Sequence, residues 1–185
     1  MQVILSGPRS IGKSTVGNIL ATRLSWQYHD LDSIVKGEVG AIKSYMAKNG
    51  LEDYRRLELR MLKQVISSAH GDSIISLGGG TGVSGYSDID AQARSLIRSS
   101  GLVIVILPCI DDEKAVDILY QFELKRSGGR SFIDTKRLYL RRRHLYEAMA
   151  HIIIYKDDKK PESMVQEIIS ILLERDLLAS DFKSI

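Results

Sequence analysis

The chain has 185 residues, of which 44% are hydrophobic and 26% are charged, as in an ordinary globular protein of single-domain size. Its net charge of +3 suits anionic small molecules and is too mild to indicate a nucleic-acid-binding surface. A single cysteine, Cys109, excludes an intrachain disulfide and a cysteine-rich zinc site.

The apolar segments are short. The longest run, residues 102–107, is far too short to span a bilayer. Met1 is followed directly by a predicted strand, which leaves no room for a secretory or transit segment. We therefore expect one cytoplasmic domain over residues 1–185, with no membrane partner.

Apolar runs alternate with helical patterns along the chain, beginning with a strand at residues 2–6 and a helix at 13–24. This alternation is typical of a parallel sheet with helices on both faces, whose ligand sites lie beyond the carboxyl ends of the strands. The further predicted elements are strand 27–30, helices across 32–69, strand 72–77, helix 86–99, strand 101–107, helices 111–126 and 134–149, strand 151–155 and helix 161–178.

Residues 7–15 fit the spacing G-x-x-x-x-G-K-[ST] between the first strand and the first helix. Such a turn points backbone N–H groups and the positive helix end at one spot, as a polyphosphate requires. Lys13 is predicted to reach the β and γ phosphates, and the Ser14 hydroxyl to hold Mg²⁺. The alternative is an ordinary glycine-rich turn, which has no need of the Lys13-Ser14 pair. The predicted ATP-binding residues of the loop are Gly7, Arg9, Ser10, Ile11, Gly12, Lys13, Ser14 and Thr15.

Two acidic residues, Asp30 and Asp32, follow the second predicted strand. Beside a phosphate loop they could serve Mg²⁺ through water and a substrate hydroxyl. Alternatively, one of them simply caps the next helix.

The helical pattern over 51–69 has an apolar face with Glu58 in its middle and Arg55 at its edge. A carboxylate on such a face is expensive to bury unless it is paired. The two residues either form a structural pair, or Glu58 holds Arg55 so that its guanidinium faces a substrate carboxylate. The apolar residues of this face are Leu51, Tyr54, Met61, Leu62, Val65 and Ala69.

Strand 72–77 runs into four glycines within residues 78–82. Because each glycine costs backbone entropy, this density indicates close approach of a ligand to the backbone, with a flexible turn as the alternative. The next strand ends in Pro108-Cys109 and has no acidic residue there, so the metal must rely on Ser14, phosphates, water and Asp30. Cys109 is interpreted as a small buried hydrophobe and not as a nucleophile.

Residues 125–131 combine basic side chains with a glycine hinge between two helices. They fit a mobile lid that brings Arg130 onto the transferring phosphate, or a surface loop with solvated charges. The next helix carries six basic residues, but its helical angles place Arg141 and Arg142 at the edges of the inward face and Arg143 outward. The basic residues are thus distributed around the helix, with two beside its inward face. This distribution indicates a cleft and argues against a flat surface for nucleic-acid binding.

Taken in this order, the motifs resemble shikimate kinase over nearly the whole chain. The matching segments are residues 7–15, Asp30-Leu31-Asp32, residues 50–58, Gly78-Gly79-Gly80, the lid with Arg126 and Arg130, and residues 142–146. The resemblance implies an α/β P-loop NTPase fold of three layers with a central five-stranded parallel sheet. It also implies a helical substrate-binding segment at about 31–60 and a short lid at about 126–134.

The resemblance further implies transfer of the γ-phosphate of ATP to the 3-hydroxyl of shikimate, with Mg²⁺ as cofactor, on the route to chorismate and aromatic amino acids. Asp32 would accept the hydroxyl proton or its hydrogen bond, Arg55 and Arg142 would grip the carboxylate, and the glycines would give backbone contacts. The implied substrate-binding set is Asp32, Arg55, Glu58, Gly78, Gly79, Gly80 and Arg142.

On the ATP side, the resemblance implies that Asp30 and Ser14 hold Mg²⁺ and that Arg126 stacks on adenine. Arg130 would be the lid arginine and, with Lys13 and Asp32, part of the catalytic set. The chain departs from the family where Ser131 follows the lid arginine in place of the usual proline. It also has Val35, Tyr54 and His144 where glutamate, phenylalanine and proline are common.

Two other interpretations are a gluconate or nucleoside monophosphate kinase, and a silent kinase-like module that binds a metabolite and regulates another protein. The carboxylate-directed arginines argue against the first, and intact Lys13, Ser14 and Asp32 argue against the second. A monomer is expected, because no heptad seam or long apolar stripe is left over.

Overall fold

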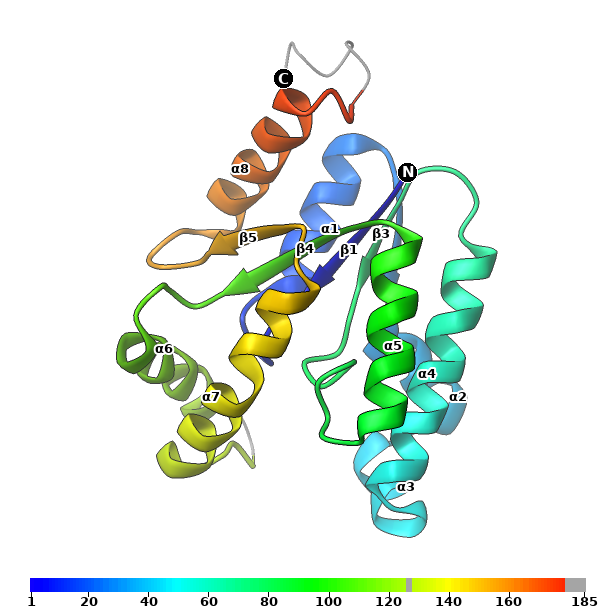
Figure 1. The fold of residues 1–185 in the computed structure, drawn as a ribbon, viewed down its shortest axis with the longest axis vertical. Coiled ribbons are helices and arrows are strands. Elements are labelled where there is room, and N and C mark those ends of the chain that lie inside the picture. Colours follow the sequence, from blue (N-terminus) through cyan, green and yellow to red (C-terminus); the bar gives the residue numbers. More distant parts are fainter. Residues whose placement is uncertain (126–127, 179–185) are drawn as a thin grey trace.

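A computed structural model describes residues 1–125 and 128–178, which fold around one parallel sheet (Figure 1). The strands lie in the order β2-β3-β1-β4-β5, and every neighbouring pair is parallel. This confirms the predicted five-stranded parallel sheet. The strands are β1 (Gln2–Ser6), β2 (Gln27–Asp30), β3 (Ser73–Ser76), β4 (Leu102–Leu107) and β5 (Ile152–Tyr155).

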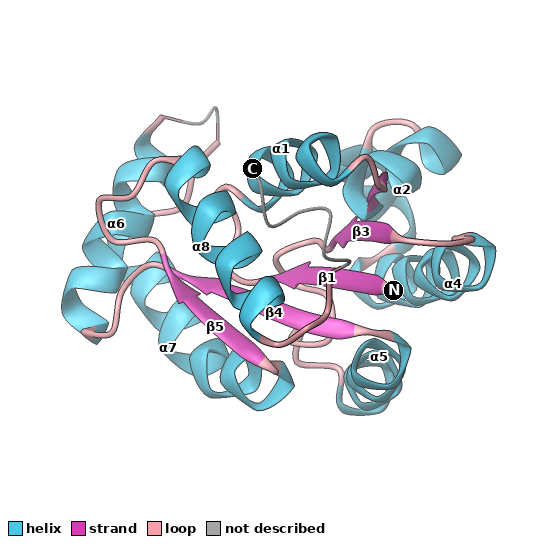
Figure 2. Ribbon diagram, turned by 90° about the horizontal axis from the view of Figure 1, so that it is seen from above, coloured by secondary structure: helices cyan, strands magenta, loops and turns pink. Residues whose placement is uncertain are grey.

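Helices cover both faces of the sheet and form the outer two of three layers (Figure 2). Helices α1 and α8 pack together on one face, and α4 and α5 lie on the other. The helices are α1 (Lys13–Leu24), α2 (Leu31–Val39), α3 (Ile42–Asn49), α4 (Leu51–Ser68), α5 (Ser87–Ser100), α6 (Asp112–Leu124), α7 (Phe132–Met149) and α8 (Pro161–Glu174).

The central strands are buried on both sides because successive side chains of a strand point to opposite faces. Leu5 of β1 packs in the core under α1 and α8, whereas its neighbour Ile4 packs in the core under α4 and α5. This double burial explains the uninterrupted apolar runs in the sequence.

The observed boundaries differ from the predicted ones at a few helix ends. The region 32–69 is three helices, separated at Gly40 and Gly50, which both have positive φ. Helix α7 begins two residues earlier than predicted, because the Ser131 hydroxyl accepts a hydrogen bond from the Asp134 N–H and caps the helix. Ser131 thus has a local role of its own. Within the described residues, none of the helices is both long and apolar enough to cross a membrane.

Asp90 anchors the loop between β3 and α5. Its buried carboxylate accepts hydrogen bonds from the Ser84 N–H at 3.0 Å, the Ser84 hydroxyl at 2.7 Å and the Gly85 N–H at 2.7 Å. We expect Asp90→Ala to lower the free energy of unfolding by about 2–3 kcal/mol, because it leaves these donors without an acceptor. Urea denaturation measures the loss.

Asp88 provides the matched control, since it is an exposed acid in the same first turn. Asp88→Ala should cost less than about 1 kcal/mol, the scale of a helix-dipole contact. Equal losses for the two variants would contradict the anchoring role of Asp90.

Candidate functional site

The predicted site residues follow three neighbouring strands. The phosphate loop follows β1, Asp30 ends β2, and the glycine-rich loop follows β3. Because parallel strands present their carboxyl ends at the same edge of the sheet, these segments meet there. Helices α6 and α7, together with Arg130 before α7, line a pocket whose other side is formed by the phosphate loop and Gly79.

Lys13 lies inside the phosphate loop. Its buried ammonium donates to the carbonyl oxygens of Gly7 at 3.0 Å and Pro8 at 2.8 Å. Burial lowers the pKa of Lys13 to about 8, and the negative charges of Asp32 and Asp30 oppose that shift. A lysine cation is therefore held at the amino end of α1, where a phosphate group is also attracted by the helix dipole.

Asp30 performs two tasks at once. One carboxylate oxygen accepts the Ser33 N–H at 2.8 Å and caps α2, and the other accepts the Ser14 hydroxyl at 2.7 Å. Burial pulls the pKa of Asp30 upward, but the hydrogen bonds from Ser14 and Ser33 outweigh it and leave the pKa below its usual value. The capping alternative is thus confirmed for Asp30, and the same side chain also binds the phosphate loop.

The chemistry of this pair fits magnesium. A hydroxyl and an ionised carboxylate are hard oxygen donors, which Mg²⁺ prefers together with water and substrate phosphates. Among the described residues, no group of three or more His, Cys, Asp or Glu gathers as a metal-binding cluster. Ser14 and Asp30 therefore suit a metal that arrives with a nucleotide and not a metal held by the protein alone.

The glycines after β3 lie against other parts of the chain. A Cβ on Gly78 would come within 2.6 Å of Asp32 Oδ1 and 2.8 Å of Glu58 Oε1, and one on Gly79 within 2.6 Å of the Arg9 nitrogen. A Cβ on Gly80 would collide with the guanidinium of Arg55. Gly79 therefore has no room for a side chain beside the phosphate-loop backbone, whereas a side chain at Gly78 or Gly80 would have to displace the ends of Asp32, Glu58 or Arg55. The protein's own packing thus explains part of the glycine density, for which a ligand contact or a flexible turn was expected.

Arg55 and Glu58 form the predicted pair on α4. Arg55 Nη1 donates to Glu58 Oε2 at 2.8 Å, and the Thr81 hydroxyl donates to Glu58 Oε1 at 2.9 Å. Burial raises the pKa of Glu58, and Arg55 and Thr81 partly offset that shift. The Arg55 Nε is buried without a hydrogen-bond acceptor among the described residues. Glu58 thus orients the guanidinium and leaves part of its donor capacity unused.

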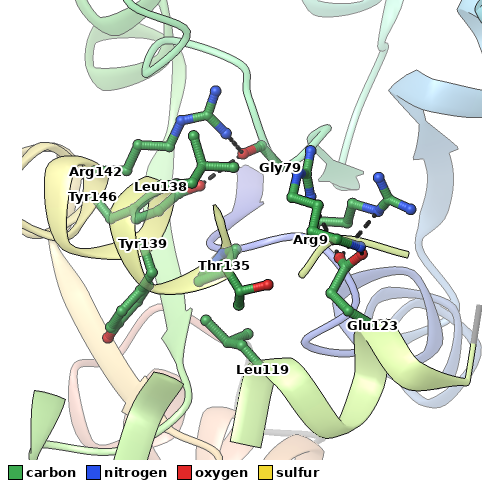
Figure 3. Close-up of a pocket in the computed structure, with 11 residues that line it drawn as sticks. Arg9, Gly79, Leu119, Glu123, Thr135, Leu138, Tyr139, Arg142 and Tyr146 are labelled. Carbon is green, nitrogen blue, oxygen red and sulfur yellow. Dashed lines mark hydrogen bonds and ion pairs between the residues drawn. The ribbon is translucent and has the colours of Figure 1, made fainter. Parts of the chain in front are cut away.

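Arg142 approaches the same glycine loop from α7. Its Nη1 donates to the Gly79 carbonyl at 3.1 Å, and the Tyr146 hydroxyl donates to that carbonyl at 2.7 Å (Figure 3). Burial lowers the pKa of Arg142, and the nearby positive charges of Arg55 and Arg130 act in the same direction. Its buried Nε also has no acceptor within the described chain. Two arginines with unused buried donors therefore flank Gly79 and Gly80, an arrangement that attracts an anion.

The predicted direction of Arg143 is wrong. Its side chain is only 14% exposed, because it donates to Glu147 on its own helix at 2.9 Å and to the Ile110 carbonyl at 2.8 Å, and pairs with Asp112. The helical periodicity of α7 predicted an outward direction for Arg143, because it takes no account of α6, which packs beside α7. Arg141 is exposed, and Cys109 is buried as expected.

Arg130 and Arg9 of the phosphate loop both pair with Glu123. The predicted adenine contact, Arg126, lies outside the described residues. Sequence reasoning missed Glu123, Thr81 and Tyr146. Of these three, only Glu123 could have been found from helical periodicity. It lies four residues after buried Leu119 and therefore on the same inward face of α6.

Comparisons with known proteins agree with one another. A family model described as shikimate kinase matches residues 9–173. The curated shikimate kinase of Streptomyces coelicolor is 30% identical over 165 residues, which cover 89% of this chain and 91% of its own. The crystal structure of shikimate kinase from Aquifex aeolicus has a TM-score of 0.76 and 30% identity, with 96% and 99% of the two chains covered. A shikimate kinase from Acinetobacter baumannii, solved in complex with shikimate, has a TM-score of 0.77 and 24% identity, covers 96% of this chain and 95% of its own, and supports the fold alone.

Proposed function

The chain belongs to the shikimate kinase family and is an ATP-dependent shikimate kinase of aromatic amino acid biosynthesis, and we propose that the cleft beyond β1, β2 and β3 carries the reaction. In it the γ-phosphate of ATP passes to the 3-hydroxyl of shikimate. The observation that supports this assignment best is the pair of buried, incompletely used guanidiniums of Arg55 and Arg142 on either side of Gly79–Gly80.

The carboxylate of shikimate is the anion that this pair of arginines would bind. Each guanidinium is already held on one side, Arg55 by Glu58 and Arg142 by the Gly79 carbonyl. Such pre-orientation lowers the entropy lost when the substrate binds. The Gly78, Gly79 and Gly80 carbonyls accept hydrogen bonds from Thr81, Arg142, Tyr146 and Val83, so the loop offers its N–H groups to the ring hydroxyls.

ATP would bind along the phosphate loop, with its phosphates at the amino end of α1 and at Lys13. Ser14 and Asp30 would hold Mg²⁺, which neutralises phosphate charge when it is bound. Arg9 of the phosphate loop and Arg130, which precedes α7, line the same pocket, where they would meet the transferring group. These residues orient the reactants and balance charge, which is most of what phosphoryl transfer requires.

Asp32 would receive the hydroxyl proton. Its side chain is exposed at the start of α2, lies against Gly78 and is close enough to Lys13 to influence that lysine's pKa. As the 3-hydroxyl oxygen bonds to the γ-phosphorus, the bond from that phosphorus to the β,γ-bridging oxygen breaks and ADP leaves. The proton released from the hydroxyl goes to the Asp32 carboxylate.

The test of this function is release of ADP from Mg-ATP with a panel of acceptors: shikimate, quinate, gluconate, AMP and none. We expect turnover with shikimate alone. Turnover with gluconate or AMP in its place would assign another small-molecule kinase activity. Silence across the panel, with shikimate still bound in a calorimetric titration, would indicate a metabolite-binding module without catalysis.

Arg142→Ala should weaken shikimate binding by about tenfold to a hundredfold, because it removes a charge-assisted contact to the carboxylate. ATP affinity should change less, since Arg142 Nη1 contacts the Gly79 carbonyl and no hydrogen bond joins Arg142 to the phosphate loop among the contacts of the described residues. Calorimetric titration of each ligand measures both effects. Arg141→Ala, an exposed neighbour on the same helix, is the control and should leave both affinities unchanged. Equal losses for the two ligands in Arg142→Ala would contradict the carboxylate assignment.

A further inference from the structure

Glu123 is a buried carboxylate in the last turn of α6, only 4% exposed. Its Oε2 accepts the backbone N–H of Arg130 at 3.0 Å. Its Oε1 lies 3.4 Å from Arg9 Nε (Figure 3). The same oxygen lies 3.4 Å from Arg130 Nη1. One side chain on α6 therefore contacts both the phosphate loop and the segment that leads into α7.

The contacts of Glu123 are unequal. The bond to the Arg130 main chain has the ordinary length of an N–H···O hydrogen bond, whereas both guanidinium contacts are longer than the usual charge-assisted bond. Glu123 thus fixes the position of the Arg130 backbone firmly. It holds the two guanidiniums loosely enough for a more highly charged partner, such as a phosphate, to take them.

Glu123 is surrounded by positively charged side chains. Among the eleven described residues that line the cavity between the phosphate loop, α6 and α7, Glu123 is the one acid and Arg9, Arg130 and Arg142 are the cations. Arg9 and Arg130 are like charges that both contact Glu123 Oε1, so without this carboxylate they would repel each other. Glu123 therefore sets the spacing between a cation of the phosphate loop, Arg9, and a cation of the segment before α7, Arg130.

We propose that Glu123 is a positioning residue for phosphoryl transfer: it fixes the main chain at Arg130 and spaces the guanidiniums of Arg130 and Arg9 so that both meet the phosphates of ATP. The inference rests on the proposed function of the cleft. Glu123 touches neither substrate in this scheme, because its oxygens are directed at the two arginines.

Glu123→Ala and Glu123→Gln test the proposal. Glutamine keeps an oxygen for the Arg130 N–H but loses the charge, and alanine loses both. For Glu123→Ala we expect kcat to fall and KM for ATP to rise, each by about tenfold, the scale of one lost hydrogen bond to a charged group, with KM for shikimate nearly unchanged. Glu123→Gln should recover part of both losses.

Glu113→Gln is the matched control. Glu113 lies on the same helix and pairs with Lys136 of α7 at 2.7 Å, but its side chain is exposed and does not line the cavity. This variant also breaks a carboxylate contact between α6 and the α7 region, so a loss of helix docking alone would appear in it. Its kinetic constants should match those of the unmodified protein.

Two readouts do not depend on turnover. Hydrogen exchange at the Arg130 amide, followed by NMR, should accelerate in Glu123→Ala and stay slow in Glu123→Gln. The calorimetric ATP affinity should fall by about tenfold in Glu123→Ala, the scale of one hydrogen bond to a charged group.

Unchanged exchange and unchanged ATP affinity in Glu123→Ala would overturn the inference even if the chain phosphorylates shikimate. Equal losses of kcat in Glu123→Ala and Glu113→Gln would overturn it as well. If the unmodified chain is inactive, the proposed function fails, and the exchange and ATP-affinity measurements alone decide the role of Glu123.

Discussion

Replacing Lys13 by methionine is expected to lower kcat by about a thousandfold or more, the scale of a cation placed on a transferring phosphate. The ammonium already sits within the phosphate loop, bound to the Gly7 and Pro8 carbonyls. Steady-state ADP release measures the loss.

The fold should survive this substitution. Because burial lowers the pKa of Lys13 to about 8, the folded protein binds this lysine's proton less tightly than the unfolded chain does. Its charged form therefore opposes folding at neutral pH, and stability rises as pH increases from about 8 toward the usual lysine pKa. Methionine removes that cost, so we expect no large decrease of the melting temperature.

Lys36→Met, an exposed lysine on α2, is the control and should leave kcat and melting unchanged. A folded Lys13→Met protein with nearly normal kcat would refute the placement of the nucleotide in this loop.

Asp32→Asn is expected to lower kcat by about 10²–10⁴, the range for loss of a general base, with a much smaller change of KM for shikimate. Asparagine has nearly the same size, which matters because Asp32 lies directly against Gly78. Asparagine still offers a hydrogen-bonding group to the 3-hydroxyl of shikimate, but it cannot take up the proton of that hydroxyl. Steady-state kinetics with varied shikimate separate the two parameters.

Glu38→Gln removes an exposed carboxylate from the same helix and should have no kinetic effect. If Asp32→Asn changed KM alone, Asp32 would bind the substrate without taking part in the chemical step.

The fold was predictable because its signals are local. Strands buried on both faces appear as apolar runs, and the intervening helices repeat their apolar residues every three to four positions. Helix ends were less predictable, because they depend on single contacts. The Ser131 cap adds residues to α7, and Gly40 and Gly50, both with positive φ, mark the ends of the helices that were predicted across 32–69 without internal boundaries before residue 51.

Residues of the candidate site could be predicted where a charged residue occurs among apolar positions. Glu58 stood out as a carboxylate on an apolar face, and the structure pairs it with Arg55. The same rule, applied to the inward face of α6, would have selected Glu123. The sequence-based prediction relied instead on the basic residues that follow α6.

Contacts between segments distant in the sequence could not be predicted. The hydrogen bonds of Thr81 to Glu58 and of Tyr146 to Gly79 join residues that are 23 and 67 positions apart. Arg143 was given the wrong direction for the same reason, because its partners on and before α6 lie at least 31 positions away. Helical periodicity describes one helix and carries no information about its neighbours.

The crowded glycines after β3 bear on drug resistance. An inhibitor that hydrogen-bonds to the backbone N–H groups of Gly79 and Gly80 would rely on donors that every residue except proline retains. A side chain at Gly79 would strike the backbone of Arg9, and one at Gly80 would have to displace the guanidinium of Arg55. A resistant variant at Gly79 would therefore need a compensating change in the phosphate loop, a much rarer event than a single base change.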